Sequence, residues 1–249
     1  MLADAHVHMG YYPRAGYEEP FYYSPRRIVG VLTRCGVDEF IVSSTCAQVH
    51  EIHIDDILRE SKEMKRLAGS RAHLFFWLSG HLYDEDRDMR WLDTGLFEGI
   101  KLHDGETPWV GKRRGDLTHI LSVANERKLS VMFHSGISND VRPCTLAQFS
   151  EQFSRVHFNF AHCRPMQEMA QIISAHDNVW TDTAYLRKHE LRKLDDFSWH
   201  GRLMFGTDLP VWQEIGNISL TREYKNNIKS FAATRISSDA FAAFKTYLA

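Results

Sequence analysis

The chain has 249 residues, and its 43% hydrophobic and 25% charged content is typical of a folded globular protein rather than a disordered one. The 30 basic and 32 acidic side chains give a formal net charge of -2, so no strong overall field favours nucleic acid or an anionic membrane. The four cysteines form no C-x-x-C pair, which argues against a zinc ribbon and against a disulfide framework.

Short apolar runs with strand-like composition alternate with helix-like stretches along the chain, a pattern typical of parallel βαβ units. The expected strands are residues 2–8, 37–44, 72–78, 97–103, 130–134, 156–162, 178–182 and 202–208. The expected helices are residues 26–34, 52–67, 116–127, 166–175, 187–194 and 239–248, which would together form an outer ring. Because such a barrel usually has about 250 residues, we predict a single α/β domain over residues 1–249, a (β/α)8 TIM barrel.

The connection after the first expected strand, residues 9–24, is long and rich in tyrosine and phenylalanine around Arg14. Loops that follow the strands carry function in β/α barrels. The segment is therefore compatible with a cover over a pocket, and equally with a loop packed on the barrel rim. It ends at Ser24-Pro25, where an N-cap serine followed by proline predicts a helix start.

Candidate metal ligands end four of the expected strands. His6 and His8 lie two residues apart in one strand, so their side chains project to the same face. His134, His162 and Asp208 end three later strands. Since a parallel barrel gathers its strand C-termini around one pocket, these side chains are suited to hold a divalent cation and the water it activates. An Asx-turn or a helix N-cap is the alternative for Asp208.

Lys101 stands two residues before His103, on the same face of an expected strand. A lysine that points into a barrel is costly unless it is paired, neutralised or chemically used. Three roles stay open: carbamylation to bridge two metal ions, binding of a substrate carboxylate, and an internal ion pair with Asp4 or Asp182.

Taken in order, the motifs resemble those of the amidohydrolase superfamily, especially its amidohydrolase-related branch. They are His6-Val7-His8 after Asp4, Gly99-Ile100-Lys101-Leu102-His103, Phe133-His134-Ser135-Gly136, Ala161-His162 and Phe205-Gly206-Thr207-Asp208-Leu209-Pro210. The resemblance implies a distorted barrel with one or two divalent ions, usually zinc, at the C-terminal ends of the strands. Asp104 stands where the fourth-strand motif commonly has proline, so the resemblance does not predict the shape of that loop.

The resemblance also implies roles for individual residues. The metal ligands would be His6, His8, His134 and Asp208. His162 would contact substrate or water, or ligate a second metal ion. Lys101 matches the position that is carbamylated in members with two metal ions.

We therefore predict a hydrolase in which a metal-activated water attacks the carbonyl of a small amide, lactone or cyclic substrate. Asp208 would take the proton and His162 would stabilise the oxyanion, with Lys101 as a third catalytic candidate. Arg14, Arg142 and Arg164 lie in or beside strand-end loops, where they are candidates to clamp a substrate carboxylate.

Three alternatives remain open. The same branch includes metal-dependent decarboxylases and hydratases of small unsaturated or aromatic acids. A TatD-like phosphodiesterase shares the H-x-H motif, although its usual fourth-strand glutamate is Lys101 here. A catalytically inactive barrel scaffold is the non-enzyme alternative.

The sequence carries no signal-like segment and no run of the roughly 18 apolar residues that a membrane helix needs. We expect a cytoplasmic protein with a small-molecule substrate, no nucleic-acid partner and no membrane contact. Assembly into a homo-oligomer stays open.

Overall fold

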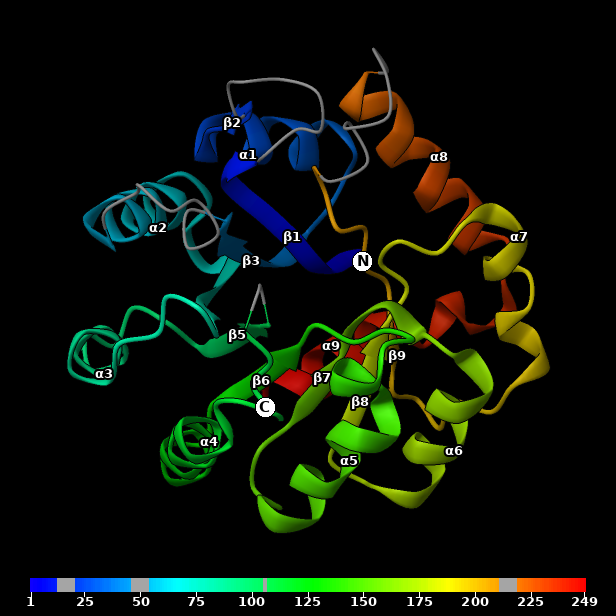
Figure 1. Ribbon diagram of the computed structural model, residues 1–249. Coiled ribbons are helices and arrows are strands. Elements are labelled where there is room, and N and C mark those ends of the chain that lie inside the picture. The colour runs from blue at the N-terminus through cyan, green and yellow to red at the C-terminus, as the bar shows by residue number, and fades with distance from the viewer. Residues whose placement is uncertain (13–20, 46–53, 105–106, 211–218) are drawn as a thin grey trace.

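The computed structural model describes residues 1–12, 21–45, 54–104, 107–210 and 219–249 (Figure 1). The strands are β1 (Ala3–Tyr12), β2 (Phe21–Tyr23), β3 (Glu39–Ser44), β4 (Ala72–Ser79), β5 (Gly99–His103), β6 (Ser130–Phe133), β7 (Phe158–Phe160), β8 (Val179–Asp182) and β9 (Leu203–Met204). The helices are α1 (Pro25–Arg34), α2 (Ile54–Ala68), α3 (Glu85–Leu92), α4 (Arg114–Arg127), α5 (Pro143–Gln152), α6 (Met166–Ala175), α7 (Lys188–Leu191), α8 (Leu220–Ala232) and α9 (Ala240–Leu248).

These strands form one curled sheet in the order β2-β1-β3-β4-β5-β6-β7-β8-β9. The pairs from β1 to β9 are parallel, whereas β2 pairs with β1 in the antiparallel sense. The segment after β9 returns to β1: the amide of Ala5 donates to the carbonyl of Phe205 (2.8 Å), and the amide of His8 donates to that of Leu209 (2.7 Å). We call this contact between β1 and residues 205–209 the seam. It places β1 beside the segment that follows β9, the last strand of the sheet.

Helices α1 to α8 lie around the outside of the sheet (Figure 1). α1 shows why they form where they do: the Ser24 side chain caps its first turn by accepting from the amide of Arg27 (3.3 Å). The helix then turns Ile28, Val31 and Leu32 towards the sheet, where they are buried. This apolar layer between helices and strands is the larger of the two core clusters among the described residues.

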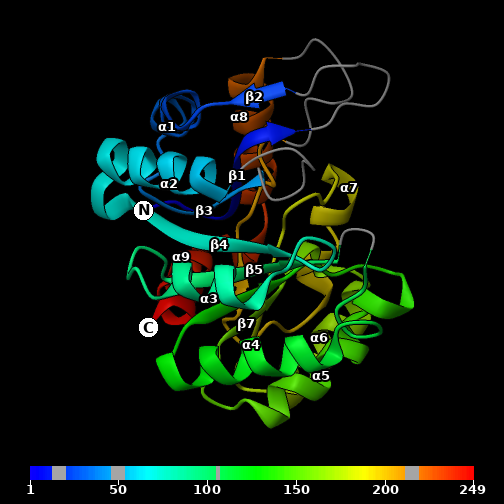
Figure 2. The ribbon, with the colours of Figure 1, turned by 60° about the vertical axis from the view of Figure 1, so that its left-hand side comes forward.

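The second cluster fills the inside of the sheet at the end where the strands start. Apolar side chains from the strands meet α9 there, together with Ala161 just after β7; the strand residues are Ala3, Ala5, Ile41, Phe75, Met132, Trp180 and Met204. Phe244 and Tyr247 of α9 insert among them and are at most 1% exposed. α9 lies behind the strands in Figure 1 and beside the start of β4 in Figure 2. The expectation that residues 239–248 join the outer ring is therefore wrong, because this helix closes one end of the sheet.

The expected strands and helices correspond to observed elements, and the α/β fold with a curled, mostly parallel sheet is confirmed. The segment after the first strand differs, because β1 runs on to Tyr12 and pairs with β2, where the Tyr11 and Tyr22 rings lie 4.6 Å apart. Arg14 lies outside the described residues. No helix in the described ranges is long and apolar enough to cross a membrane.

Candidate metal centre

His6 and His8 face each other inside the sheet, with their Nε2 atoms 3.1 Å apart. An irregularity in the register of β1 between Asp4 and Val7 accompanies this placement. The other nitrogen of each ring has a partner: His6 Nδ1 lies 3.2 Å from Asp182 Oδ2, and His8 Nδ1 lies 2.9 Å from Ser43 Oγ. A proton on each Nδ1 leaves each Nε2 unprotonated, the usual arrangement of metal-binding histidines.

Asp208 completes a group with these two imidazoles. Its Oδ1 lies 2.9 Å from His8 Nε2 and 3.5 Å from His6 Nε2. Ligands of a tetrahedral zinc ion with bonds of about 2.0 to 2.1 Å lie roughly 3.3 Å apart, so the spacing of this donor set fits a zinc-sized ion. The backbone of Asp208 is left-handed (φ 58°), a strained conformation that is common at functional sites.

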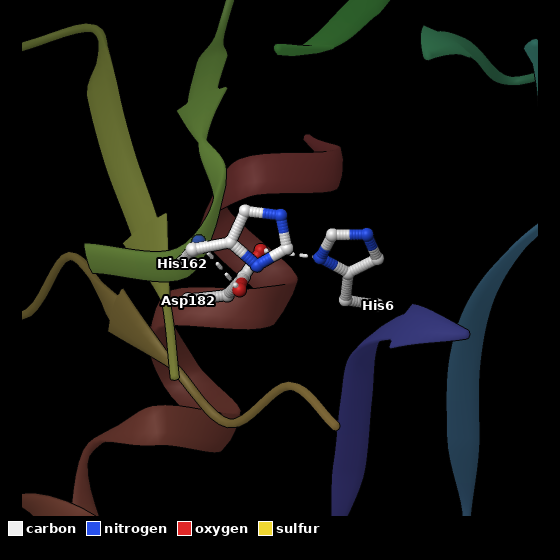
Figure 3. A group of neighbouring side chains, drawn as sticks. All are labelled: His6, His162 and Asp182. Atoms are coloured by element: carbon white, nitrogen blue, oxygen red, sulfur yellow. Dashed lines mark hydrogen bonds and ion pairs between the residues drawn. The ribbon is translucent and has the colours of Figure 1, made fainter. Parts of the chain in front are cut away.

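Asp182 holds a second group together with His6 and His162 (Figure 3). Besides its contact with His6, its Oδ2 accepts from Asn159 Nδ2 (2.7 Å). Its Oδ1 accepts from the backbone amides of His162 (3.2 Å) and Ala184 (2.9 Å). With both oxygens engaged in this way, Asp182 is placed to orient His6 and the turn at His162.

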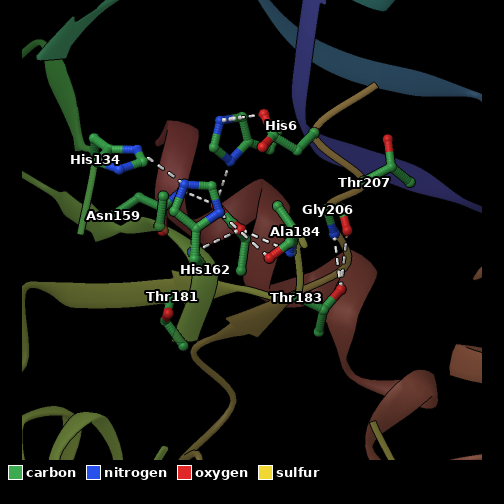
Figure 4. Close-up of polar contacts among 12 residues, drawn as sticks. His6, His134, Asn159, His162, Thr181, Thr183, Ala184, Gly206 and Thr207 are labelled. Carbon is green, nitrogen blue, oxygen red and sulfur yellow. Dashed lines mark hydrogen bonds and ion pairs between the residues drawn. The ribbon is translucent and has the colours of Figure 1, made fainter. Parts of the chain in front are cut away.

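His134 and His162 form a pair beside this group (Figure 4). His134 Nδ1 lies 3.1 Å from His162 Nε2, and the rings of His134 and His103 are 4.4 Å apart. His162 also has a left-handed backbone (φ 74°), and its Nδ1 lies 3.3 Å from the carbonyl of Ala184. Among the described residues His134 therefore neighbours His162, while the group around Asp208 contains His6 and His8.

Lys101 is fully enclosed, with 1% of its surface exposed, and its Nζ lies 3.1 Å from His6 Nε2. Burial lowers the pKa of Lys101 to about 8, against the opposing effect of Asp208 and Asp182. Asp4 is one of the two ion-pair partners expected for Lys101. Its carboxylate accepts hydrogen bonds from Thr207, from the amide of His6 and from the Tyr224 hydroxyl. The lysine nitrogen thus sits beside the candidate ion position.

The electrostatic state of the histidines and of Asp208 suits a cation. Burial lowers the pKa of His6 to about 3 and lowers that of His8 and His162 as well, so the imidazoles stay neutral. Burial alone would raise the pKa of Asp208, but His6, His8 and His162 hold it well below its ordinary value. Neutral imidazoles and an ionised carboxylate are the forms that bind divalent metals.

The arginines proposed for substrate binding have partners within the protein. Arg142 Nε donates to Glu168 Oε2 (2.8 Å), and its side chain is 44% exposed. Arg164 Nη2 donates to the carbonyl of Tyr185 (2.6 Å) and to Glu190 Oε2 (3.2 Å). Their role towards a substrate stays a prediction.

Sequence reasoning did not identify the residues that orient the candidate ligands. The sequence indicates Asp182 only as an ion-pair partner of Lys101, although it ends an expected strand as the histidines do. Ser43 and Asn159 carry no motif, and their roles depend on which strands lie side by side.

Comparisons with known proteins agree with this architecture. A family model described as amidohydrolase matches residues 82–225. No curated protein matches the sequence.

Among solved structures, a putative 2-pyrone-4,6-dicarboxylic acid hydrolase from Pseudomonas putida is similar, with a TM-score of 0.68 at 13% identity over 99% of this chain and 96% of that one. A 4-oxalomesaconate hydratase from Rhodopseudomonas palustris has a TM-score of 0.67 at 13% identity over 99% and 94%. An amidohydrolase from Burkholderia multivorans with bound zinc has a TM-score of 0.62 at 14% identity over 98% and 95%. At these identities the likeness concerns the fold alone.

Proposed function

Because this chain belongs to the amidohydrolase family, we propose that it is a metal-dependent hydrolase acting on a small, carboxylate-bearing lactone, amide or cyclic substrate. The observation that carries the proposal is the group formed by His6, His8 and Asp208, whose ligand atoms lie within 4.8 Å of one another. Zinc is the proposed ion, since imidazole and carboxylate are ligands it accepts and a structurally similar amidohydrolase binds it. The bound ion would supply Lewis acidity and a water acidic enough to react near neutral pH.

Side chains of the protein would supply proton transfer, oxyanion stabilisation and substrate binding. Asp208 lies at the candidate ion position and is ionised, so it is placed to accept the proton of the attacking water. His162 is the proposed residue to stabilise the oxyanion: its Nε2 would donate when the ring carries its proton there rather than on Nδ1, which lies 3.3 Å from the carbonyl of Ala184. Lys101 would hold the substrate carboxylate or balance its charge. Arg142 and Arg164 remain candidates to clamp a substrate carboxylate, as does Arg14, which lies outside the described residues.

A lyase of a small unsaturated acid is the second candidate. The structure resembles the 4-oxalomesaconate hydratase and the pyrone dicarboxylic acid hydrolase almost equally, with TM-scores of 0.67 and 0.68. The same ligand group would serve both reactions. Screening should therefore include hydration and decarboxylation of small acids beside hydrolysis of lactones and amides.

The test is metal content in protein purified without chelator, compared between wild type and the His6→Ala/His8→Ala variant. We expect about one equivalent of zinc per chain, lost in the variant. The His119→Ala/His189→Ala variant is the matched control, because both of those histidines are exposed. Absence of metal even after incubation with zinc, or full retention in the His6→Ala/His8→Ala variant, would overturn the proposal and favour an inactive scaffold.

A further inference from the structure

One buried carboxylate, that of Asp4, joins the two segments that carry the candidate ligands. Its Oδ1 accepts from the backbone amides of His6 (3.0 Å) and Thr207 (3.1 Å). Its Oδ2 accepts from Thr207 Oγ1 (2.6 Å) and from Tyr224 Oη of α8 (2.5 Å). Asp4 is 0% exposed and Tyr224 1% exposed, so these contacts are shielded from water.

These contacts lie on the seam between β1 and residues 205–209. The amide of Asp208 donates to the carbonyl of His6 (2.8 Å), and the amide of Leu209 donates to Thr207 Oγ1 (3.2 Å). His6 and His8 come from one side of the seam and Asp208 from the other. The distance between His8 Nε2 and Asp208 Oδ1 therefore depends on how the two backbones are aligned.

Tyr224 brings an outer helix into this arrangement. Within the described part of the chain, its hydroxyl is the one hydrogen-bond donor to the Asp4 carboxylate that comes from outside β1 and residues 205–209. The adjacent left-handed backbone at Asp208 needs such support, because a strained conformation persists only where its surroundings hold it.

We propose that Asp4, Thr207 and Tyr224 form a positioning network that sets the affinity for the metal ion by aligning His6 with Asp208 across the seam. None of the three belongs to the candidate ligand group. The inference rests on the proposed metal site and adds to it that α8, on the outside of the sheet, controls how tightly the ion is held.

The test is the zinc dissociation constant of the full-length protein, measured by competition with a chromophoric chelator. Tyr224→Phe removes one hydroxyl and should weaken zinc binding about 10-fold, in the range found when groups that orient metal ligands are removed. Thr207→Val should weaken it at least as much, whereas Thr207→Ser keeps the hydroxyl and should restore wild-type affinity.

Tyr247→Phe is the matched control, because the Tyr247 hydroxyl is buried without a hydrogen-bond partner in the described part of the chain. Its zinc affinity should equal that of wild type. Thermal unfolding of each metal-free variant separates positioning from general damage: a purely structural role lowers the unfolding temperature and leaves the dissociation constant unchanged.

Wild-type zinc affinity in both Tyr224→Phe and Thr207→Val would overturn the inference, and so would an equal loss in Tyr247→Phe. Failure of wild type itself to bind zinc is a different result, which would overturn the proposed function.

Discussion

The interior of the curled sheet is filled in opposite ways at its two ends. Where the strands start, apolar side chains such as Phe75 and Met132 meet Phe244 of α9 in one cluster. Where the strands end, the interior holds ionisable side chains that are just as buried, among them Lys101 and Asp182 at 1% and 0% exposure. Depth alone therefore does not distinguish the two ends.

The two ends differ in the interactions that make the burial of their side chains favourable. The apolar end is stabilised by removal of hydrocarbon from water. The polar end requires that each charge or imidazole finds a partner, and the contacts of Asp182 with four donors show how this is met. In β/α barrels the end built from the strand C-termini carries the chemistry and the opposite end carries stability. The following predictions test that division.

The largest effect is expected at the polar end. Asp208→Asn keeps the size of the side chain but removes the charge and the proton acceptor. We expect turnover to fall by at least about 100-fold, with the far-ultraviolet circular dichroism unchanged. Initial rates are measured on zinc-loaded protein with a substrate that wild type converts. Full activity of the loaded variant would exclude Asp208 from the reaction.

At the apolar end, substitutions are expected to change mainly the free energy of unfolding. Phe244→Ala leaves a cavity among the side chains that α9 covers and should lower the free energy of unfolding by about 3–5 kcal/mol. Urea denaturation measures this loss, and zinc content should match wild type. Phe241→Ala, a partly buried position on the same helix, should cost clearly less. Loss of zinc in Phe244→Ala would show that the two ends are not independent.

Acid should weaken the polar end selectively. Burial lowers the pKa of His6 to about 3, whereas the unfolded chain binds that proton near the ordinary value of 6.5. The contribution of neutral His6 to the free energy of unfolding is therefore complete above about pH 6.5. It is lost as the pH falls, by about 2 kcal/mol at about pH 5.

The measurement compares urea denaturation of metal-free wild type and His6→Ala at about pH 7 and pH 5. Burial raises the pKa of Asp4 to about 7, which acts in the opposite direction over this range, so the difference between the two proteins is the relevant quantity. We expect His6→Ala to lose less stability on acidification than wild type. Equal losses of stability in the two proteins would contradict the assignment of this pH dependence to His6.

The smallest effect is expected at the surface of the apolar end. Lys245 of α9 forms an ion pair with Glu39 at 2.9 Å, and its side chain is 51% exposed. Exposed pairs contribute at most about 1 kcal/mol, so Lys245→Ala should shift the unfolding free energy by less than that. A loss as large as that of Phe244→Ala would mean that charge, rather than apolar packing, holds α9 in place.

The comparison also explains which features could be predicted from the sequence. The polar end could be predicted because His8, two residues after His6, and Asp208 stand at the ends of expected strands, and parallel strands bring their ends together. The position of α9 could not be predicted, since an apolar helix face does not reveal which apolar surface it covers. Glu168 and Glu190, the partners of the two arginines, lie in later elements, and only the packing of those elements brings them near.

The seam has a consequence for the order of events during synthesis. Thr207 and Asp4 are 203 positions apart, yet they hydrogen bond across it. At about 5–20 residues per second a ribosome needs roughly 10–40 s to make that interval. Throughout this time the edge of β1 that will face residues 205–209 lacks that partner. The ligand group is therefore assembled late, and a nascent chain that stops before Asp208 lacks it altogether.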